Sequence, residues 1–76
     1  MVAKLSQLAP GQRARIVSVG GAGPTRRRML DLGLVAGTDI AAVRTAPLND
    51  PVEYAVRGYH LAMRRRDAEA IAVELL

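Results

Sequence analysis

Residues 47–63, PLNDPVEYAVRGYHLAM, contain the clearest evidence for the fold. They begin with a strong turn signal, because two prolines enclose Leu, Asn and Asp within five residues. Residues 52–57 then alternate between two faces, with valine or tyrosine at positions 52, 54 and 56, as in a strand with one buried face. Gly58 and Tyr59 join this segment to a further strand at residues 60–63. The segment therefore predicts two short, consecutive strands.

Glycine and proline divide the rest of the chain in the same way. Further strands are expected at residues 12–19, 38–46 and 71–75, a short helix at 25–32 and a helical turn at 65–70. The alternation in residues 12–19 is imperfect, with Ile16 expected inside. Gly33 suits the left-handed position after a helix, and in a Schellman ending Leu34 could pack back on Met29. Because there is too little helix for crossover connections, the chain predicts a mainly β fold. We expect a small antiparallel barrel of about five strands, with one short inserted helix and a short helical turn before the last strand.

The length of 76 residues limits the chain to a single domain, residues 1–76. Area scaling gives about 4,500 Å² of exposed surface in the folded state, so roughly 60% of the surface of the unfolded chain is buried. The chain has no Phe, Trp or Cys, which leaves an aliphatic core without disulfide bonds. The predicted core contains the apolar positions that recur across the strands: Ile16, Ile40, Val43, Val52, Val56, Leu61, Ile71 and Val73.

The charge is basic, with a net +4 and runs of arginine at residues 26–28 and 64–66. Such runs suit acidic partners, and nucleic acid is one candidate. Only two tyrosines are available to stack bases, and acidic residues follow each run closely, so a solvated, partly paired surface is the favoured interpretation. No long apolar stretch resembles a signal peptide or a membrane span, so we expect a cytosolic protein.

Residues for catalysis and metal binding are scarce. The chain has one histidine, two serines and no cysteine, so no catalytic residue is assigned, no cofactor is predicted, and the protein is expected not to be an enzyme. His60 is interpreted as a packing or surface residue, and no tight metal site is expected. Weak binding of divalent or transition metal ions by exposed carboxylates stays open. The glycines of residues 20–23 are interpreted as a flexible turn before the helix rather than a phosphate-binding loop.

Four groups of residues together carry a family pattern. They are Leu8-x-x-Gly11, Arg28-x-Leu30-x-Leu32-Gly33-Leu34-x-x-Gly37-x-x-Ile40, Ala46-Pro47-Leu48-x-Asp50-Pro51-Val52 and Val56-Arg57-Gly58-Tyr59-x-Leu61-Ala62-Met63-Arg64. The combination resembles the FeoA domain family and spans nearly the whole chain. The resemblance implies an SH3-like barrel, found as a free cytosolic protein or as the C-terminal domain of iron-dependent repressors.

For a free domain, the resemblance implies a non-enzymatic accessory protein of bacterial ferrous iron uptake and iron homeostasis. Its partner would be the cytosolic part of the FeoB-type membrane transporter, through which alone it would reach the membrane. No small-molecule substrate, catalytic residue or cofactor is implied. The alternatives are a nucleic-acid-binding β-barrel, or a stand-alone relative of the repressor domain. A homo-oligomer remains an option.

The predicted partner-binding site lies on the inserted helix and its ending. Residues 29–34 hold more apolar side chains than a helix of two turns needs for packing. We expect Leu30 and Leu34 to face outward, with Arg27 and Arg28 at the rim to attract an acidic surface. The alternative, that these apolar residues all belong to the core, stays open.

Overall fold

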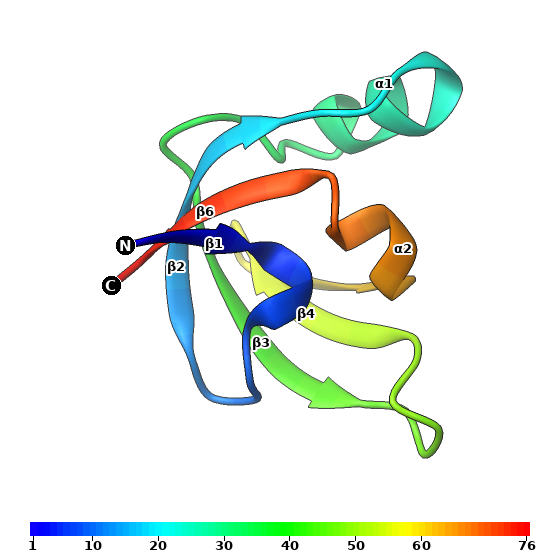
Figure 1. The fold of residues 1–76 in the computed structure, drawn as a ribbon. Helices are drawn as coiled ribbons and strands as arrows, with labels where there is room; N and C mark the ends of the chain where they lie inside the picture. Colours follow the sequence, from blue (N-terminus) through cyan, green and yellow to red (C-terminus); the bar gives the residue numbers. More distant parts are fainter.

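The computed structural model describes residues 1–76 and contains one antiparallel sheet of six strands. The strands are β1 (Val2–Lys4), β2 (Arg13–Val19), β3 (Asp39–Thr45), β4 (Val52–Val56), β5 (Tyr59–Met63) and β6 (Ile71–Leu75). The helices are the 3-10 helix η1 (Leu5–Gln7), α1 (Gly23–Asp31) and α2 (Arg65–Ala68). The strand order is β1-β6-β2-β3-β4-β5, so β1 and β5 are the two edges. The sheet is strongly curved, and both α-helices lie on one side of it (Figure 1).

The predicted mainly β fold is confirmed, including the inserted helix between the first two long strands and the helical turn before the last strand. The expected number of strands was one too low, because no strand was predicted at residues 2–4, which form β1. Its three residues pair with β6, with Val2 opposite Glu74 and Ala3 opposite Val73. A strand of three residues has almost no alternation to detect, and its hydrogen-bonding partner is at the far end of the chain.

The two ends of the chain lie side by side as a result of this pairing (Figure 1). The Leu75 N–H donates to the Met1 carbonyl at 3.2 Å, and the N-terminal ammonium lies 3.8 Å from Glu74 Oε1. Figure 1 shows both ends on the side of the sheet away from α1 and α2.

Sixteen buried residues form one apolar core, with Tyr54 as its largest fully buried side chain. Six of the eight predicted core residues are buried: Ile16, Ile40, Val52, Val56, Ile71 and Val73. Val43 and Leu61 were also predicted to lie in the core, but both are only partly buried. The exposed surface is 4663 Å², close to the area expected from length, so the chain is as compact as folded proteins of this mass usually are.

Strand pairing is irregular at two places, and the one in β2 explains where the alternation of that strand fails. The register of β2 against β6 shifts between Ile16 and Ser18, and consequently Val19 takes the buried place that strict alternation gives to Ser18. A second shift lies between Ala42 and Arg44, which leaves Val43 as the extra residue of β3. Val43 faces away from the core by simple alternation, because Ile40 and Ala42 are the buried residues of this strand.

The longer helix, α1, has nine residues. No helix in the structure combines the length and apolar character required to span a membrane.

Candidate partner-binding groove

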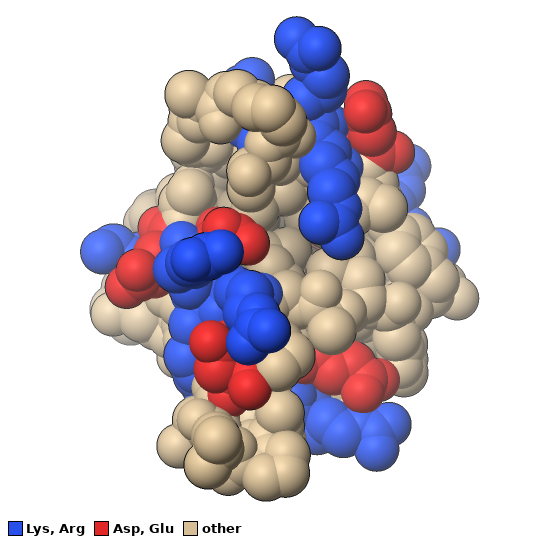
Figure 2. Space-filling model, turned by 90° about the vertical axis from the view of Figure 1, so that its right-hand side faces the viewer, with Lys and Arg blue, Asp and Glu red and all other residues tan.

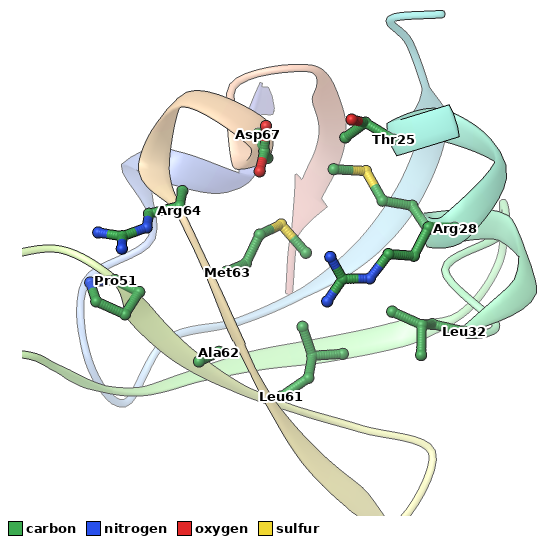
Figure 3. Close-up of a pocket in the computed structure, with 10 residues that line it drawn as sticks. Thr25, Arg28, Leu32, Pro51, Leu61, Ala62, Met63, Arg64 and Asp67 are labelled. Carbon is green, nitrogen blue, oxygen red and sulfur yellow. The ribbon is translucent and has the colours of Figure 1, made fainter. Parts of the chain in front are cut away.

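A groove opens between α1 and α2, with β5 along its floor (Figure 3). Its volume is about 310 Å³. The lining residues are Thr25, Arg28, Met29 and Leu32 from α1 and its end, Pro51, Leu61, Ala62 and Met63 from β5 and the turn before β4, and Arg64 and Asp67 from α2 and its start. We call this hollow the interhelix groove.

The first wall of the groove, α1, is fixed where it begins. Just before it, the Gly20 N–H donates to the Ala70 carbonyl at 2.7 Å, and this contact ties the glycine segment to the turn before β6. Pro24 occupies the first turn, where no N–H is needed. Arg26 of the same helix donates from Nε to the Val19 carbonyl at 3.0 Å, so the first arginine run is partly used in structure.

The end of α1 has the predicted Schellman geometry. Gly33 has a φ of +92°, the Leu34 N–H donates to the Met29 carbonyl at 3.1 Å, and the Gly33 N–H donates to the Leu30 carbonyl at 3.0 Å. Leu34 and Met29 are both buried in the core, as this motif requires. The prediction that Leu34 packs back on Met29 is therefore supported by their shared burial.

The β4–β5 hairpin secures this end of α1 from outside. Arg57 Nη1 donates to the Gly33 carbonyl at 3.4 Å, and the Tyr59 hydroxyl donates to the Leu32 carbonyl. A Cβ on Gly33 would lie 2.9 Å from Arg57 Cδ, so the arginine side chain occupies the space that only glycine leaves free. The wall and the floor of the groove are thus held together by the same hairpin.

The second wall, α2, is only four residues long and is held by Arg65. The guanidinium donates from Nη1 to the Ser6 carbonyl at 2.9 Å and from Nε to the Asn49 carbonyl at 2.5 Å, and the Arg65 N–H donates to Asp50 Oδ1 at 3.0 Å. Ala68 is fully buried beneath the helix. The central arginine of the second run is therefore a structural residue.

The groove combines an apolar floor with a basic rim. Met63 is buried and Leu61 is partly buried against the core. Arg64 lies 3.9 Å from Asp50, whereas no carboxylate lies within 4.0 Å of Arg28. Figure 2, which looks at the right-hand side of Figure 1, shows uncharged surface bordered by basic side chains, with acidic side chains beside some of them. The arrangement fits an apolar group with negative charge beside it.

The predicted site residues are only partly brought together. Arg28 lines the interhelix groove, and Arg27 lines an adjoining hollow with Arg28 and Asp31. Leu30 is half-buried against the core. The expectation that Leu34 faces outward was wrong, because its exposed fraction is 0%. The Schellman ending reverses the chain direction and carries this residue inward.

Sequence reasoning missed most of the groove. Leu61 was assigned to the core, and Met29 and Leu32 were not assigned to the partner site, since apolar residues in a strand or helix are read as packing residues. A signal was nevertheless present: a helical segment begins two residues after Met63, and a second arginine run is located there.

A separate polar cluster lies on β3, β4 and β5. His60 Nδ1 is 2.6 Å from Glu53 Oε2, and Arg44 Nε is 2.8 Å from Glu53 Oε1. The hydrogen bond with His60, with a further contribution from Arg44, lowers the pKa of Glu53 against the opposing effect of desolvation. No group of three or more His, Cys, Asp or Glu side chains with metal-binding geometry occurs in the chain, so the cluster offers two ligands at most.

The one buried hydroxyl of the core belongs to Tyr54. It donates to the Leu5 carbonyl at 3.4 Å, and burial raises its pKa. A neutral, hydrogen-bonded phenol serves packing rather than acid–base chemistry.

The comparisons with known proteins agree with this architecture. The family model described as the FeoA domain matches residues 3–75. A fusion of Fe(2+) transport protein A with the Fe(2+) transporter FeoB, from Porphyromonas gingivalis, is 47% identical over 73 residues, which are 96% of this chain and 9% of the fusion protein. The chain thus spans less than a tenth of the length of that relative.

Two solved structures extend the comparison. The FeoA protein of Chlorobium tepidum superposes with a TM-score of 0.91 at 47% identity, covering 97% of this chain and 70% of that one. The FeoA of Stenotrophomonas maltophilia, described as a prokaryotic SH3 domain protein and solved with zinc, has a TM-score of 0.85 at 26% identity. That match covers 95% of this chain and 89% of the other. The SH3-like fold and the association of this fold with ferrous iron transport proteins are both confirmed.

Proposed function

This chain belongs to the FeoA domain family, and from that premise we propose that it is a non-enzymatic, cytosolic accessory protein of ferrous iron uptake that binds the cytosolic part of a FeoB-type transporter. The observation that carries the proposal is the P. gingivalis fusion, in which a domain 47% identical to this chain is part of one polypeptide with FeoB. Covalent linkage keeps two proteins at a high effective concentration, as expected of domains that work in contact.

The interhelix groove supports the proposal by its chemistry. It has an apolar floor around Leu61 and Met63 and a basic rim at Arg28 and Arg64, which is the composition of a protein-binding patch. Arg27, beside the groove, would steer the same acidic partner surface, and Leu30 would contribute through the part of its side chain that is exposed. The groove lining contains no nucleophile beside a base, so its chemistry favours binding over catalysis.

The test is calorimetric titration of the protein with the isolated cytosolic domain of the FeoB-type transporter from the same organism. We expect Arg28→Glu and Leu61→Ala to weaken binding about tenfold or more, because one reverses a rim charge and the other shortens the apolar floor. Arg13→Glu and Leu48→Ala are matched controls, since these exposed residues line no part of the groove. Equal affinity for all four variants, or no binding by the wild type, contradicts the proposal.

Nucleic acid binding is the competing function, and the free guanidinium groups of Arg27 and Arg28 favour it. The second arginine run counts against it, because Arg64 is near Asp50, Arg65 binds backbone carbonyls and Arg66 is near Asp67. Titration with duplex DNA and single-stranded RNA distinguishes the two functions. Binding whose logarithm falls steeply with the logarithm of salt concentration would favour nucleic acid.

A further inference from the structure

We propose that the interhelix groove accepts an extended, acidic segment of the partner protein, which adds to the sheet as a new strand on the free edge of β5. The inference rests on the proposed function and specifies how its site is used. It is supported by the hydrogen-bonding pattern of β5, by the course of the groove along this strand, and by the charge of the rim.

The hydrogen-bonding pattern of β5 follows from the turn before it. Arg57 and Gly58 both have positive φ, 50° and 84°, so the β4–β5 hairpin has a two-residue turn of the primed type. Val56 and Tyr59, which flank this turn, are paired in register, and in such a hairpin the flanking pair exchanges both backbone hydrogen bonds. The bonded pairs then recur at every second residue along the strand.

Consequently, alternate residues of β5 direct their backbone groups in opposite directions. Tyr59, Leu61 and Met63 bond to β4, whereas His60 and Ala62 direct N–H and C=O toward the edge that no strand covers. None of the backbone hydrogen bonds made outside the helices and strands involves His60 or Ala62. Two residues of β5 therefore present four backbone groups to an incoming strand.

The groove runs along this edge. Leu61, Ala62, Met63 and Arg64 all line it. Successive side chains of a strand point to opposite faces, so consecutive residues can border one hollow only along the edge of the strand. Figure 3 shows α1 and α2 on either side of β5, with Leu61 and Met63 between them. At about 310 Å³ the groove has the size of a small ligand pocket, so it has room for a few side chains of an inserted segment.

The rim supplies charge complementarity. Arg28 extends over the groove from α1 without a carboxylate partner, and Arg64 lies at the start of α2 with only the distant Asp50 contact of 3.9 Å. The one acid of the lining, Asp67, lies 4.0 Å from Arg66. In strand addition the backbone provides affinity and alternate side chains provide specificity. The occupant therefore alternates apolar residues, which face Met63, with acidic residues, which face the arginines.

The decisive variant is Ala62→Pro, with Ala62→Val as its matched control. Proline removes the N–H at the free edge but leaves the bonds of Leu61 and Met63 to β4, and proline is tolerated on edge strands. Valine keeps the N–H and suits a strand. Two probes are titrated: the cytosolic domain of the FeoB-type transporter, and a capped hexapeptide of alternating glutamate and valine. A second hexapeptide, N-methylated on the central residues, lacks the backbone donors for pairing.

The expected result is a loss of at least tenfold in affinity for both probes in Ala62→Pro, the size of one lost hydrogen bond. Ala62→Val should remain within threefold of wild type. The N-methylated peptide should fail to bind wild type, which keeps the test valid if Ala62→Pro does not fold. In the wild type, the amide of Ala62 should exchange rapidly when free and become protected when the peptide is bound.

Unchanged binding by Ala62→Pro, equal binding of the N-methylated peptide, or equal binding of a lysine–valine hexapeptide would overturn the inference. So would a dimer, seen by sedimentation, that Ala62→Pro dissociates, since a second copy would then occupy the edge. If Arg28→Glu weakens transporter binding and Ala62→Pro does not, the proposed function stands and strand addition falls. If only the peptide binds, strand addition stands and the transporter is the wrong partner.

Discussion

Replacing Leu34 with alanine should destabilise the protein strongly and loosen α1. Leu34 is completely buried and follows Gly33, whose left-handed conformation directs it into the core. Its N–H also donates to the Met29 carbonyl at 3.1 Å, which ties Leu34 to the end of α1. The buried side chain of Leu34 therefore anchors this end of α1, the first wall of the interhelix groove. The variant keeps this backbone bond and removes only the side-chain packing.

The magnitude follows from burial. Leucine-to-alanine changes at fully buried positions cost about 3–5 kcal/mol, because lost transfer energy is joined by a residual cavity. A domain of this length has a total stability of roughly 4–11 kcal/mol. The change therefore removes a large part of the stability. At about 4–8 °C per kcal/mol for a domain of this size, the melting temperature should fall by at least about 12 °C.

The assay is urea unfolding followed by far-ultraviolet circular dichroism, with Leu48→Ala as control. Leu48 is 90% exposed, so the same chemical change there should alter the free energy of unfolding by less than about 0.5 kcal/mol. The slope of free energy against urea should stay constant in both variants. If Leu34→Ala unfolds within about 1 kcal/mol of wild type, the burial of this residue does not hold α1 in place, and the reasoning is refuted.

Three further predictions concern the hairpin and the polar cluster. Gly33→Ala should lower the free energy of unfolding by about 1–2 kcal/mol because of the positive φ, and further because of the contact with Arg57. The control is Gly37→Ala, at a φ of +89° in open space, where thermal melts should show the backbone contribution alone. The pKa of Glu53 is lowered from its ordinary value of 4.5, so its ionised form stabilises the fold above pH 4.5, and this contribution is lost as the pH falls through the pKa of the folded state. The free energy of unfolding, measured by urea titration at several pH values, should therefore depend less on pH in His60→Ala than in the wild type. Anaerobic calorimetry with Fe²⁺ or Zn²⁺ should reveal no site with a submicromolar dissociation constant. A site of that affinity that His60→Ala abolishes would contradict the prediction.

Local sequence patterns predicted the fold where each strand carries its own signal. The β4 strand alternates cleanly, and the turns on both sides of it are marked by proline and glycine, so its start was predicted correctly and its end to within one residue. The edge strand β1 has no such signal, because it exists only through pairing with β6. Val43 was misplaced for a different reason: it was assigned to the core together with Ile40, although residues three apart face opposite sides of a strand, and Ile40 and Ala42 are the buried residues of β3.

The candidate site was harder to predict because it is assembled from three segments. Glycine at position 33 indicated the helix ending correctly, but the direction of Leu34 depends on where the core lies relative to that ending. Arg28 was identified by its charge. Leu61 and Met63 gave no local sign that one edge of their strand is open, since only the strand order reveals it.

The pairing of β1 with β6 makes this domain easy to transplant. Its entry and exit points are separated by about one strand spacing of 4.8 Å, and both point away from the groove (Figure 1). A host protein can therefore accept it within a surface loop as readily as at a terminus, with short connectors and no distortion of the binding face. Affinity tags, fluorophores or a tethered partner can likewise be attached at either end while the groove stays open to its ligand.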